Sequence, residues 1–367
     1  MLSFIIIVTI ICICYFYYLY HRRRNNKKQF LPSTLADMEL AILPCQNTRL
    51  NMLYSPMLHY NPDEYAITKI ERKQITLTKP LGSGAFGKVF QGNVKNLKKS
   101  RTEISGTVAI KTLREDASLN EKKKFLKEAK LMSHFRHKHI LRLLAICEDG
   151  DSPLLVLELM ETDLSKYLRD CRNLQASDLH ALRLQDLLAM CEDVARGCCY
   201  LEELRFVHRD LACRNCLVSS RNREDRVIKI GDFGLARNIY KDDYYRMKGD
   251  DPLPIRWMAP ESLTFGIFTS QSDVWSFGIL MWEITSLGEQ PYIGKSNEEL
   301  INYVRAAGKL PINPINLNCP SILYQLMLRC WRTAGARPNF KLCLKNIIAL
   351  RKNIEDALLI MSPVDTI

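Results

Sequence analysis

The chain has 367 residues and a mass of 42.4 kDa, which is enough for one large core or two smaller ones. Its net charge is +12, but five of the cations lie between Arg22 and Lys28 and the others are spread along the chain, which argues against a nucleic-acid-binding surface. The thirteen cysteines do not have the spacing of a zinc site, because Cys213-x-x-Cys216 has no second pair. We therefore expect a reducing, cytosolic environment for most of the chain, with cysteines such as Cys198, Cys199 and Cys330 acting as small apolar core residues.

The first twenty residues predict a transmembrane helix. Leu2–Tyr20 carries no charge, and as a helix it would be about 28 Å long, close to the roughly 30 Å of a bilayer core. Aromatic residues gather at its end and Arg22–Arg24 follow, whereas a signal peptide would begin with basic residues and end at a cleavage site. The positive-inside rule predicts a single-pass membrane protein whose remainder lies in the cytoplasm.

Residues 21–70 are polar, contain scattered prolines and lack periodicity, which predicts a juxtamembrane linker. Within it, Tyr54-Ser55-Pro56-Met57 has the Tyr-x-x-Met form that SH2 domains bind when the tyrosine is phosphorylated. Binding of SH2-type adaptors through Tyr54 is one hypothesis, and chance occurrence of a four-residue pattern is the alternative.

A glycine-rich loop follows the predicted strand Ile75–Leu77. Residues 81–89 read Leu-Gly-Ser-Gly-Ala-Phe-Gly-Lys-Val, and such glycines let backbone amides approach phosphate oxygens closely. A dinucleotide site would continue as a helix, but here a second strand, Lys88–Phe90, follows. The loop is therefore predicted to cover the phosphates of a mononucleotide.

A lysine and a glutamate further along are predicted to pair. Val108–Lys111 is an apolar strand that ends in a lysine, and Glu121–Phe135 has the composition of a helix. The apolar positions of this helix at i, i+4 and i+7 are Phe125, Ala129 and Met132. Glu128 lies on the same stripe, and a buried carboxylate requires a partner. We expect Glu128 to direct Lys111 toward the α- and β-phosphates; the alternative is that Lys111 is an ordinary surface lysine.

Two motifs predict phosphoryl transfer. A long apolar helix predicted over Leu179–Leu204 leads into His208-Arg209-Asp210-Leu211-Ala212-Cys213-Arg214-Asn215, and Asp232-Phe233-Gly234 begins seventeen residues after Asn215. Asp210 would accept the proton of an attacking hydroxyl, while Asn215 and Asp232 would hold Mg²⁺ (or Mn²⁺) against the phosphates of ATP. This combination of motifs at this spacing is specific.

On these motifs the chain resembles protein kinases over residues 70–355, and within them tyrosine kinases. Ala212 and Arg214 match the tyrosine-kinase catalytic loop, and Cys213 replaces its customary alanine. Pro254–Glu261 is similar to the tyrosine-kinase form of the substrate-binding segment. The resemblance implies that Arg214 reaches over the γ-phosphate while leaving room for a phenol.

Three further segments narrow the resemblance. Asn238–Arg246 resembles the activation loop of insulin-receptor-like kinases, with Tyr240, Tyr244 and Tyr245 as expected phosphorylation sites. Met160–Leu164 and Phe265–Gly278 are most similar to the sevenless/Ros receptor branch, although one hinge residue is missing before Asp163. Receptors of this branch carry a large ectodomain, so the chain is interpreted either as a fragment or as a membrane-anchored kinase without a ligand-binding part.

The resemblance implies an α+β, bilobal kinase fold after the transmembrane helix. The expected divisions are residues 1–20 (transmembrane helix), 21–70 (linker), 71–158 (β-rich N-lobe with one helix), 159–355 (mainly helical C-lobe) and 356–367 (short tail). It also implies that Asp273 anchors the catalytic loop and that Glu261 pairs with Arg337. The expected ATP-binding residues are Leu81, Gly82, Ser83, Gly84, Gly87, Val89, Ala109, Lys111, Glu128, Leu157, Glu158, Met160 and Leu217.

The expected function is that of a membrane-anchored, receptor-type protein-tyrosine kinase that phosphorylates proteins on tyrosine. Activation is expected to require dimerisation and trans-autophosphorylation of the activation loop. The alternatives are a pseudokinase, a serine/threonine or dual-specificity kinase, and an adaptor that acts through Tyr54. Because Lys111, Asp210, Asn215 and Asp232 are all present, the pseudokinase alternative is disfavoured.

Overall fold

The computed structural model describes residues 67–354, apart from 85–86, 100–101, 115, 151, 173, 175–177, 179, 234–252 and 313–319. All of the described residues belong to one compact unit, residues 51–367. The predicted membrane span, Tyr54 and the three activation-loop tyrosines lie outside the described residues. Across the described stretches, every helix is too short or too polar to cross a bilayer.

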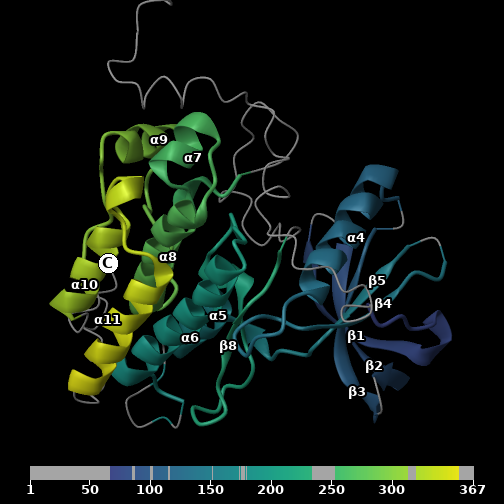
Figure 1. Ribbon diagram of the computed structural model, residues 1–367. Coiled ribbons are helices and arrows are strands. Elements are labelled where there is room, and N and C mark those ends of the chain that lie inside the picture. Colours follow the sequence, from purple (N-terminus) through teal and green to yellow (C-terminus); the bar gives the residue numbers. More distant parts are fainter. Residues whose placement is uncertain are drawn as a thin grey trace, which may run out of the picture. The chain divides into compact units, whose positions relative to one another are not determined.

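A five-stranded antiparallel sheet forms the N-lobe, with strand order β1-β2-β3-β5-β4 (Figure 1). The strands are β1 (Ile75–Gly84), β2 (Gly87–Lys99), β3 (Thr102–Thr112), β4 (Leu143–Cys147) and β5 (Leu154–Leu157). Side chains alternate between the two faces of a strand. Val108 and Ile110 accordingly pack in one cluster, while Ala109 belongs to the main core on the other face. Ile70, in the predicted linker, already donates its N–H to Ile146 O of this sheet.

Helix α4 (Leu119–Ser133) is the long helix among the described residues of the N-lobe (Figure 1). The predicted apolar stripe is confirmed, since Phe125, Ala129 and Met132 are at most 2% exposed. The helix begins two residues before the predicted start because Ser118 caps it: its Oγ accepts the N–H of Glu121, whose carboxylate accepts the N–H of Ser118. It ends at Ser133, two residues before the predicted end.

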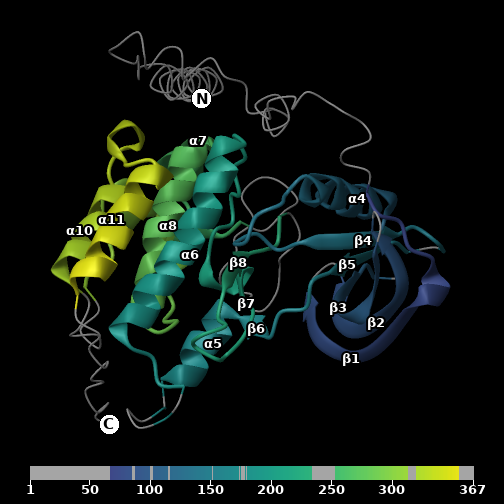
Figure 2. The same cartoon turned by 60° about the horizontal axis from the view of Figure 1, so that its bottom comes forward.

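The C-lobe is mainly helical, as the resemblance implies. Its helices are α5 (Leu164–Cys171), α6 (Leu184–Glu203), α7 (Pro260–Phe265), α8 (Ser270–Thr285), α9 (Asn297–Arg305), α10 (Ser321–Cys330) and α11 (Phe340–Asn353). A small antiparallel sheet joins β6 (Thr162–Asp163), β7 (Cys216–Val218) and β8 (Ile228–Ile230). Helix α11 packs along α6, and α10 along α8 (Figure 2).

The prediction that one helix extends over Leu179–Leu204 is wrong at its start. Helix α6 begins at Leu184, because the carboxylate of Asp186 accepts the N–H of Arg183 at 2.9 Å and so fixes the first turn there. An acidic residue in the first turn also interacts favourably with the helix dipole. The apolar periodicity upstream of Arg183 therefore does not belong to the helix.

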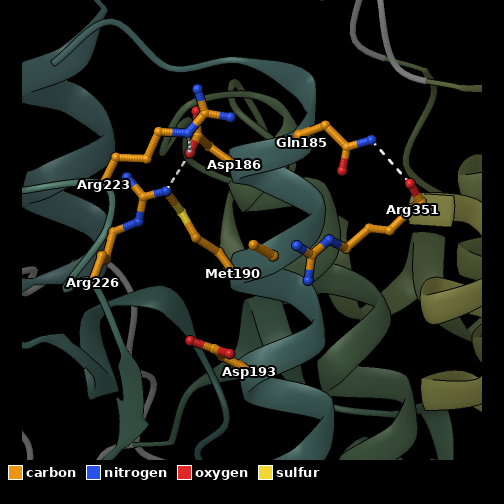
Figure 3. Close-up of a pocket in the computed structure, with 8 residues that line it drawn as sticks. Gln185, Asp186, Met190, Asp193, Arg223, Arg226 and Arg351 are labelled. Atoms are coloured by element: carbon orange, nitrogen blue, oxygen red, sulfur yellow. Dashed lines mark hydrogen bonds and ion pairs between the residues drawn. The ribbon is translucent and has the colours of Figure 1, made fainter. Parts of the chain in front are cut away.

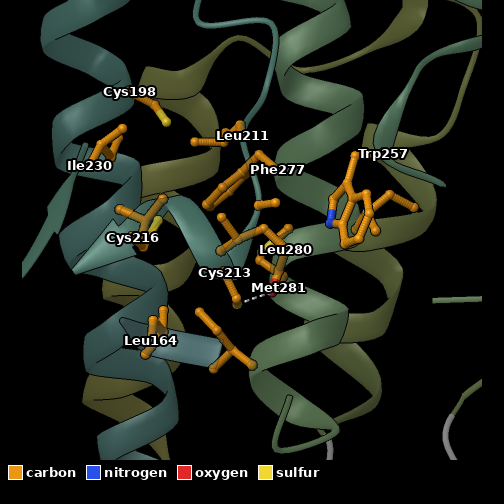
Figure 4. Packing of buried hydrophobic residues seen from close by; sticks show 14 of the residues in the cluster. Leu164, Cys198, Leu211, Cys213, Cys216, Ile230, Trp257, Phe277, Leu280 and Met281 are labelled. Atoms are coloured by element: carbon orange, nitrogen blue, oxygen red, sulfur yellow. Dashed lines mark hydrogen bonds between the residues drawn. The ribbon is translucent and has the colours of Figure 1, made fainter. Parts of the chain in front are cut away.

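Helix α8 is buried on all sides from Ser272 to Thr285 and forms the centre of the C-lobe. Its residues Phe277, Leu280 and Met281 lie beside the catalytic-loop residue Cys213 (Figure 4). Cys198 and Cys330 are at most 3% exposed, which confirms the prediction that they are apolar core residues, while Cys199 is half-buried at the edge of the core. Cys213 is buried as well. Burial raises the pKa of the Cys199 thiol to about 12, so that thiol stays protonated.

Candidate active site

The lysine at the end of β3 contacts acidic residues from both lobes. Its Nζ lies 3.1 Å from Glu128 Oε1 and 3.5 Å from Asp232 Oδ1, so the predicted Lys111–Glu128 pair is present. Glu128 is almost fully buried, whereas Asp232 keeps 21% of its side chain exposed. Burial alone would lower the pKa of Lys111, but the charges of Asp232 and Glu128 outweigh it and raise the pKa. The site therefore presents a permanently charged ammonium group.

Asp232 has an unusual backbone conformation that directs its side chain. Its φ is +59°, in the left-handed region that non-glycine residues seldom occupy. The following residue, Phe233, packs its ring 4.9 Å from Phe135 and 5.2 Å from His208, measured between ring centroids. Because this buried phenyl ring holds the segment in place, the Asp232 carboxylate points toward Lys111.

The catalytic loop is held by one buried carboxylate of α8. Asp273 is 4% exposed and accepts the N–H groups of His208 at 2.6 Å and Arg209 at 2.9 Å, as the resemblance implied. The His208 ring continues this network: Nδ1 lies 3.3 Å from the Asp210 N–H, and Nε2 lies 3.0 Å from Gly231 O. These partners fit a neutral imidazole with its proton on Nε2. The ring thus connects the loop to the residue before Asp232.

Asp210 is oriented by two residues of its own loop. Arg214 Nη2 lies 2.6 Å from Asp210 Oδ1, and Asn215 Nδ2 donates to Asp210 O at 2.7 Å. Asp210 remains 21% exposed at the side chain, whereas Asn215 is buried. The Gly231 N–H donates to Asn215 O at 2.8 Å, which places the two predicted metal-binding residues on adjoining segments. Their amide and carboxylate oxygens are the hard ligands that Mg²⁺ prefers.

The comparisons with known proteins agree with this geometry. A family model described as protein tyrosine and serine/threonine kinase matches residues 75–347. The transforming protein ros of UR2 avian sarcoma virus is 52% identical over 273 residues, which cover 73% of this chain and 67% of the viral protein. The chain belongs to the sevenless/ROS branch of the protein tyrosine kinases.

Two cellular relatives are much longer than this chain. Protein sevenless of Drosophila melanogaster is 44% identical over 343 residues, and the proto-oncogene tyrosine-protein kinase ROS of Rattus norvegicus is 52% identical over 273 residues. The matched regions cover 91% and 73% of this chain but only 12% and 11% of those proteins. The chain therefore contains a receptor-type tyrosine kinase domain, and its bilobal fold is that of the family.

A carboxylate that sequence reasoning missed supports the catalytic loop of this kinase domain. Glu283, 4% exposed on α8, accepts from Trp257 Nε1 at 2.8 Å and from the Cys213 N–H at 3.0 Å with the same oxygen. The Trp257 ring in turn carries the Arg214 guanidinium 4.0 Å from its centroid. Arg214 thus lies between Trp257 and Asp210 in this structure. The available sequence signal was a glutamate in the long apolar stretch that forms the second half of α8.

The residues predicted around the adenine gather on one face of the N-lobe sheet. Val89 pairs with Lys111 and Ala109 with Leu157 across neighbouring strands, so these side chains share a face. Ala109 and Leu157 are buried, whereas Leu81 is 44% exposed at the rim. The half-buried Met160 and Leu217 pack against the same core.

Two hinge carboxylates are already engaged by protein groups. Glu158 binds Lys229 Nζ at 2.7 Å and accepts the Arg142 N–H at 2.8 Å, so a contact with adenine would involve its backbone. Asp163 caps α5 by accepting the Lys166 N–H at 2.7 Å.

The glycine-rich loop contains glycines with two different roles. A side chain on Gly87 would collide with the backbone of β3, since its Cβ would lie 1.8 Å from Thr112 O. Gly82, by contrast, faces open space within 4 Å. Ser83 and Gly84 pair with Lys88 and Gly87 across the turn of the hairpin. Gly87 is therefore required by the sheet itself, and Gly82 leaves room above the site.

A cavity of about 140 Å³ lies elsewhere in the C-lobe, between α6, α11 and the β7–β8 connection (Figure 3). Its lining residues are Gln185, Asp186, Ala189, Met190, Asp193, Arg223, Arg226 and Arg351. Arg226 and Arg223 pair with Asp186, and Arg351 pairs with Glu192. These ion pairs join α6 to α11 and to the β7–β8 connection, so this cavity is a structural feature of the lobe.

Proposed function

We propose that this domain transfers the γ-phosphoryl group of ATP to tyrosine hydroxyls of proteins. The observation that carries the proposal is the position of Lys111, whose Nζ contacts Glu128 of α4 and Asp232 of the C-lobe at once. This arrangement brings a phosphate-binding cation and a metal-binding carboxylate into one site, which phosphoryl transfer requires. The relatives named above as tyrosine-protein kinases support the choice of substrate residue.

Each residue has a defined task in this proposal. Asp210, oriented by Arg214 and Asn215, accepts the proton of the tyrosine hydroxyl as it attacks. Lys111 holds the α- and β-phosphates, and Asn215 and Asp232 would hold Mg²⁺ or Mn²⁺. A bound divalent cation neutralises charge on the phosphate oxygens. Arg214, which lies against Trp257, would leave room for a phenol beside Asp210.

The proposal also covers how the whole chain is regulated and where it is located. Residues 2–20 would anchor the kinase in a membrane, where dimerisation brings two domains together for trans-autophosphorylation of Tyr240, Tyr244 and Tyr245. Each phosphate adds about −1.5 to −2 charges, and we expect Arg209 to bind one of these phosphates. The Arg209 guanidinium lies 5.4 Å from the centroid of the Phe268 ring. Phosphorylated Tyr54 would recruit SH2-type adaptors.

One time course tests the reaction and its activation together. Dephosphorylated protein of residues 51–367 is mixed at several concentrations with Mg-ATP and a poly-Glu-Tyr peptide, and the products are separated by phosphoamino-acid analysis. We expect phosphotyrosine, formed after a lag that shortens as the enzyme concentration rises. A variant with phenylalanine at Tyr240, Tyr244 and Tyr245 should lose both the lag and most of the activity.

Two results would contradict parts of this account. Phosphoserine as the main product would exclude tyrosine specificity. A lag that is independent of enzyme concentration would exclude trans-autophosphorylation and leave the chemistry untouched. Membrane anchoring is tested separately: the full chain should stay in the membrane fraction after alkaline extraction, and the chain without residues 2–20 should not.

A further inference from the structure

The outer face of α4 carries a row of exposed lysines. Lys123, Lys127 and Lys130 follow at i, i+4 and i+7, on the side opposite the buried stripe that includes Phe125. At the start of this face Leu119 is 76% exposed, the second most exposed of the large apolar side chains in the described residues. We call Leu119 and these three lysines the α4 outer face. Beyond the helix, Arg136 and Lys138 are exposed as well.

The stability of the helix does not explain this arrangement. Lysines three and four residues apart repel one another, and Lys123 lies in the first half of the helix, where positive charge opposes the helix dipole; only Lys130, in the last turn, interacts favourably with it. Both carboxylates of α4 are engaged elsewhere: Glu121 binds Ser118 and Arg114, and Glu128 binds Lys111. Among the residues that the structure describes, no ion pair neutralises the three lysines of the α4 outer face. An external anionic partner would do so.

We propose that the α4 outer face docks on an anionic lipid bilayer. The three lysines span about 10 Å along the helix, which allows all of them to approach one flat, negatively charged surface. Leu119, at the N-terminal end of the row, can enter the boundary between headgroups and acyl chains, as apolar residues of interfacial helices do. An acidic protein would satisfy the lysines but gives no reason for an exposed leucine beside them. If residues 2–20 span the membrane as proposed, this surface is always within reach.

Docking would act on the catalytic site through α4. The helix presents its lysines outward and Glu128 inward, so a membrane that holds its outer face also fixes the position of Glu128. The Lys111–Glu128 pair would then be favoured in the docked domain. Anionic vesicles should therefore raise the activity of the domain as well as bind it.

Vesicle sedimentation tests the proposal with the domain of residues 51–367, which forms its own compact unit around its own core. We expect stronger binding to vesicles that contain phosphatidylserine than to pure phosphatidylcholine, and weaker binding as salt rises. Replacing Lys123, Lys127 and Lys130 together by glutamine should lower the partition coefficient more than tenfold. Leu119→Ser should lower it severalfold.

A matched control distinguishes binding through the α4 outer face from a general effect of net charge. Lys341, Lys345 and Lys352 are exposed on α11, and their replacement by glutamine removes the same three charges from another surface. That variant should bind vesicles nearly as well as the wild type. Both triple variants should keep the wild-type thermal stability and the basal activity without vesicles, because none of these residues contacts the catalytic site.

Three outcomes would overturn the proposal. One is equal binding of the wild-type domain to neutral and anionic vesicles, and another is an equal loss of binding in both triple variants. The third combines two results: the domain binds soluble polyglutamate through the α4 lysines, and Leu119→Ser leaves vesicle binding unchanged. That combination would indicate an acidic protein partner instead. Tyrosine phosphorylation by the free domain does not depend on any of these results, so the proposed function could hold if docking fails.

Discussion

Buried carboxylates are the most informative single residues of this domain. A buried charge without a partner costs several kcal/mol, so each one indicates a contact that the fold must provide. Glu128 satisfies this requirement with Lys111, and Glu283 with Trp257 and the Cys213 backbone. The first contact could be predicted because helical periodicity placed Glu128 on an apolar stripe. The second was missed because α8 is buried on all sides, so that its sequence pattern does not indicate a single inward face.

Replacing Glu128 by glutamine tests the first contact. The variant keeps the size of the side chain but removes the charge that positions Lys111, so kcat should fall about tenfold or more while the KM for ATP changes less. Glu148→Gln is the matched control, since Glu148 forms an exposed pair with Lys69 on the same lobe and should leave both parameters unchanged. Steady-state kinetics of the two variants give the kcat and the KM for ATP that this comparison needs. Wild-type kcat in Glu128→Gln would show that the pair does not position Lys111 for catalysis.

Replacing Trp257 by phenylalanine tests the second contact. The change removes the hydrogen bond to Glu283 and should cost about 1–3 kcal/mol of unfolding free energy, because a buried carboxylate loses one donor. Since Trp257 supports Arg214, and Arg214 orients Asp210, kcat for a tyrosine peptide should fall more than its KM rises. Trp331→Phe is the control, because Trp331 Nε1 makes no hydrogen bond within the described residues. Equal effects of the two substitutions on kcat would contradict a positioning role for Trp257.

At the scale of elements, α8 organises the catalytic loop from both of its ends. Asp273 in its first turn and Glu283 near its last turn accept backbone N–H groups of His208, Arg209 and Cys213. The helix can do this because its buried position excludes competing water. The catalytic loop is thus fixed by a helix that contributes no residue to the chemistry.

The Asp273 carboxylate should make stability depend on pH. Burial raises its pKa to about 6 from the ordinary 3.8, so its contribution to stability is complete below 3.8 and is lost as the pH rises through 6. Between about pH 4.5 and pH 7 this loss amounts to roughly 2 kcal/mol. Denaturant unfolding of the wild type and Asp273→Asn should therefore show a difference that shrinks by about that amount toward neutral pH. A difference that stays constant with pH would contradict the raised pKa.

The elements show why some sequence predictions succeeded and others did not. The interior of α4 followed from a 3.6-residue period, and the alternation of Val108, Ala109 and Ile110 agrees with a strand buried on both faces. Helix starts are decided instead by single hydrogen bonds, such as those of Ser118 and Asp186, which periodicity does not reveal. The position of Arg214 also depended on a distant residue, Trp257. The resemblance to tyrosine kinases implied that Arg214 reaches over the γ-phosphate, but it did not indicate that Arg214 contacts Trp257.

At the scale of the whole domain, the site combines segments that are far apart in the sequence. Lys111 comes from the sheet, Glu128 from α4, and Asp232 follows β8 of the C-lobe. Motif order alone indicates that such residues belong together, but only the folded chain brings them within 3.5 Å of one amine. The matched region corresponds to 12% of sevenless and 11% of rat ROS, so most of the length of these receptors lies outside the region that matches this chain.

The role of Asp210 as the proton acceptor is the central claim, and one comparison tests it most directly. Transfer of labelled phosphate from Mg-ATP to a tyrosine peptide is measured for the wild type, for Asp210→Asn and for Asp225→Asn, which makes the same change on the exposed β7–β8 connection. We predict that Asp210→Asn loses on the order of a thousandfold in rate, while Asp225→Asn retains the wild-type rate. Phosphotyrosine formation by Asp210→Asn at a rate close to that of the wild type would contradict the account.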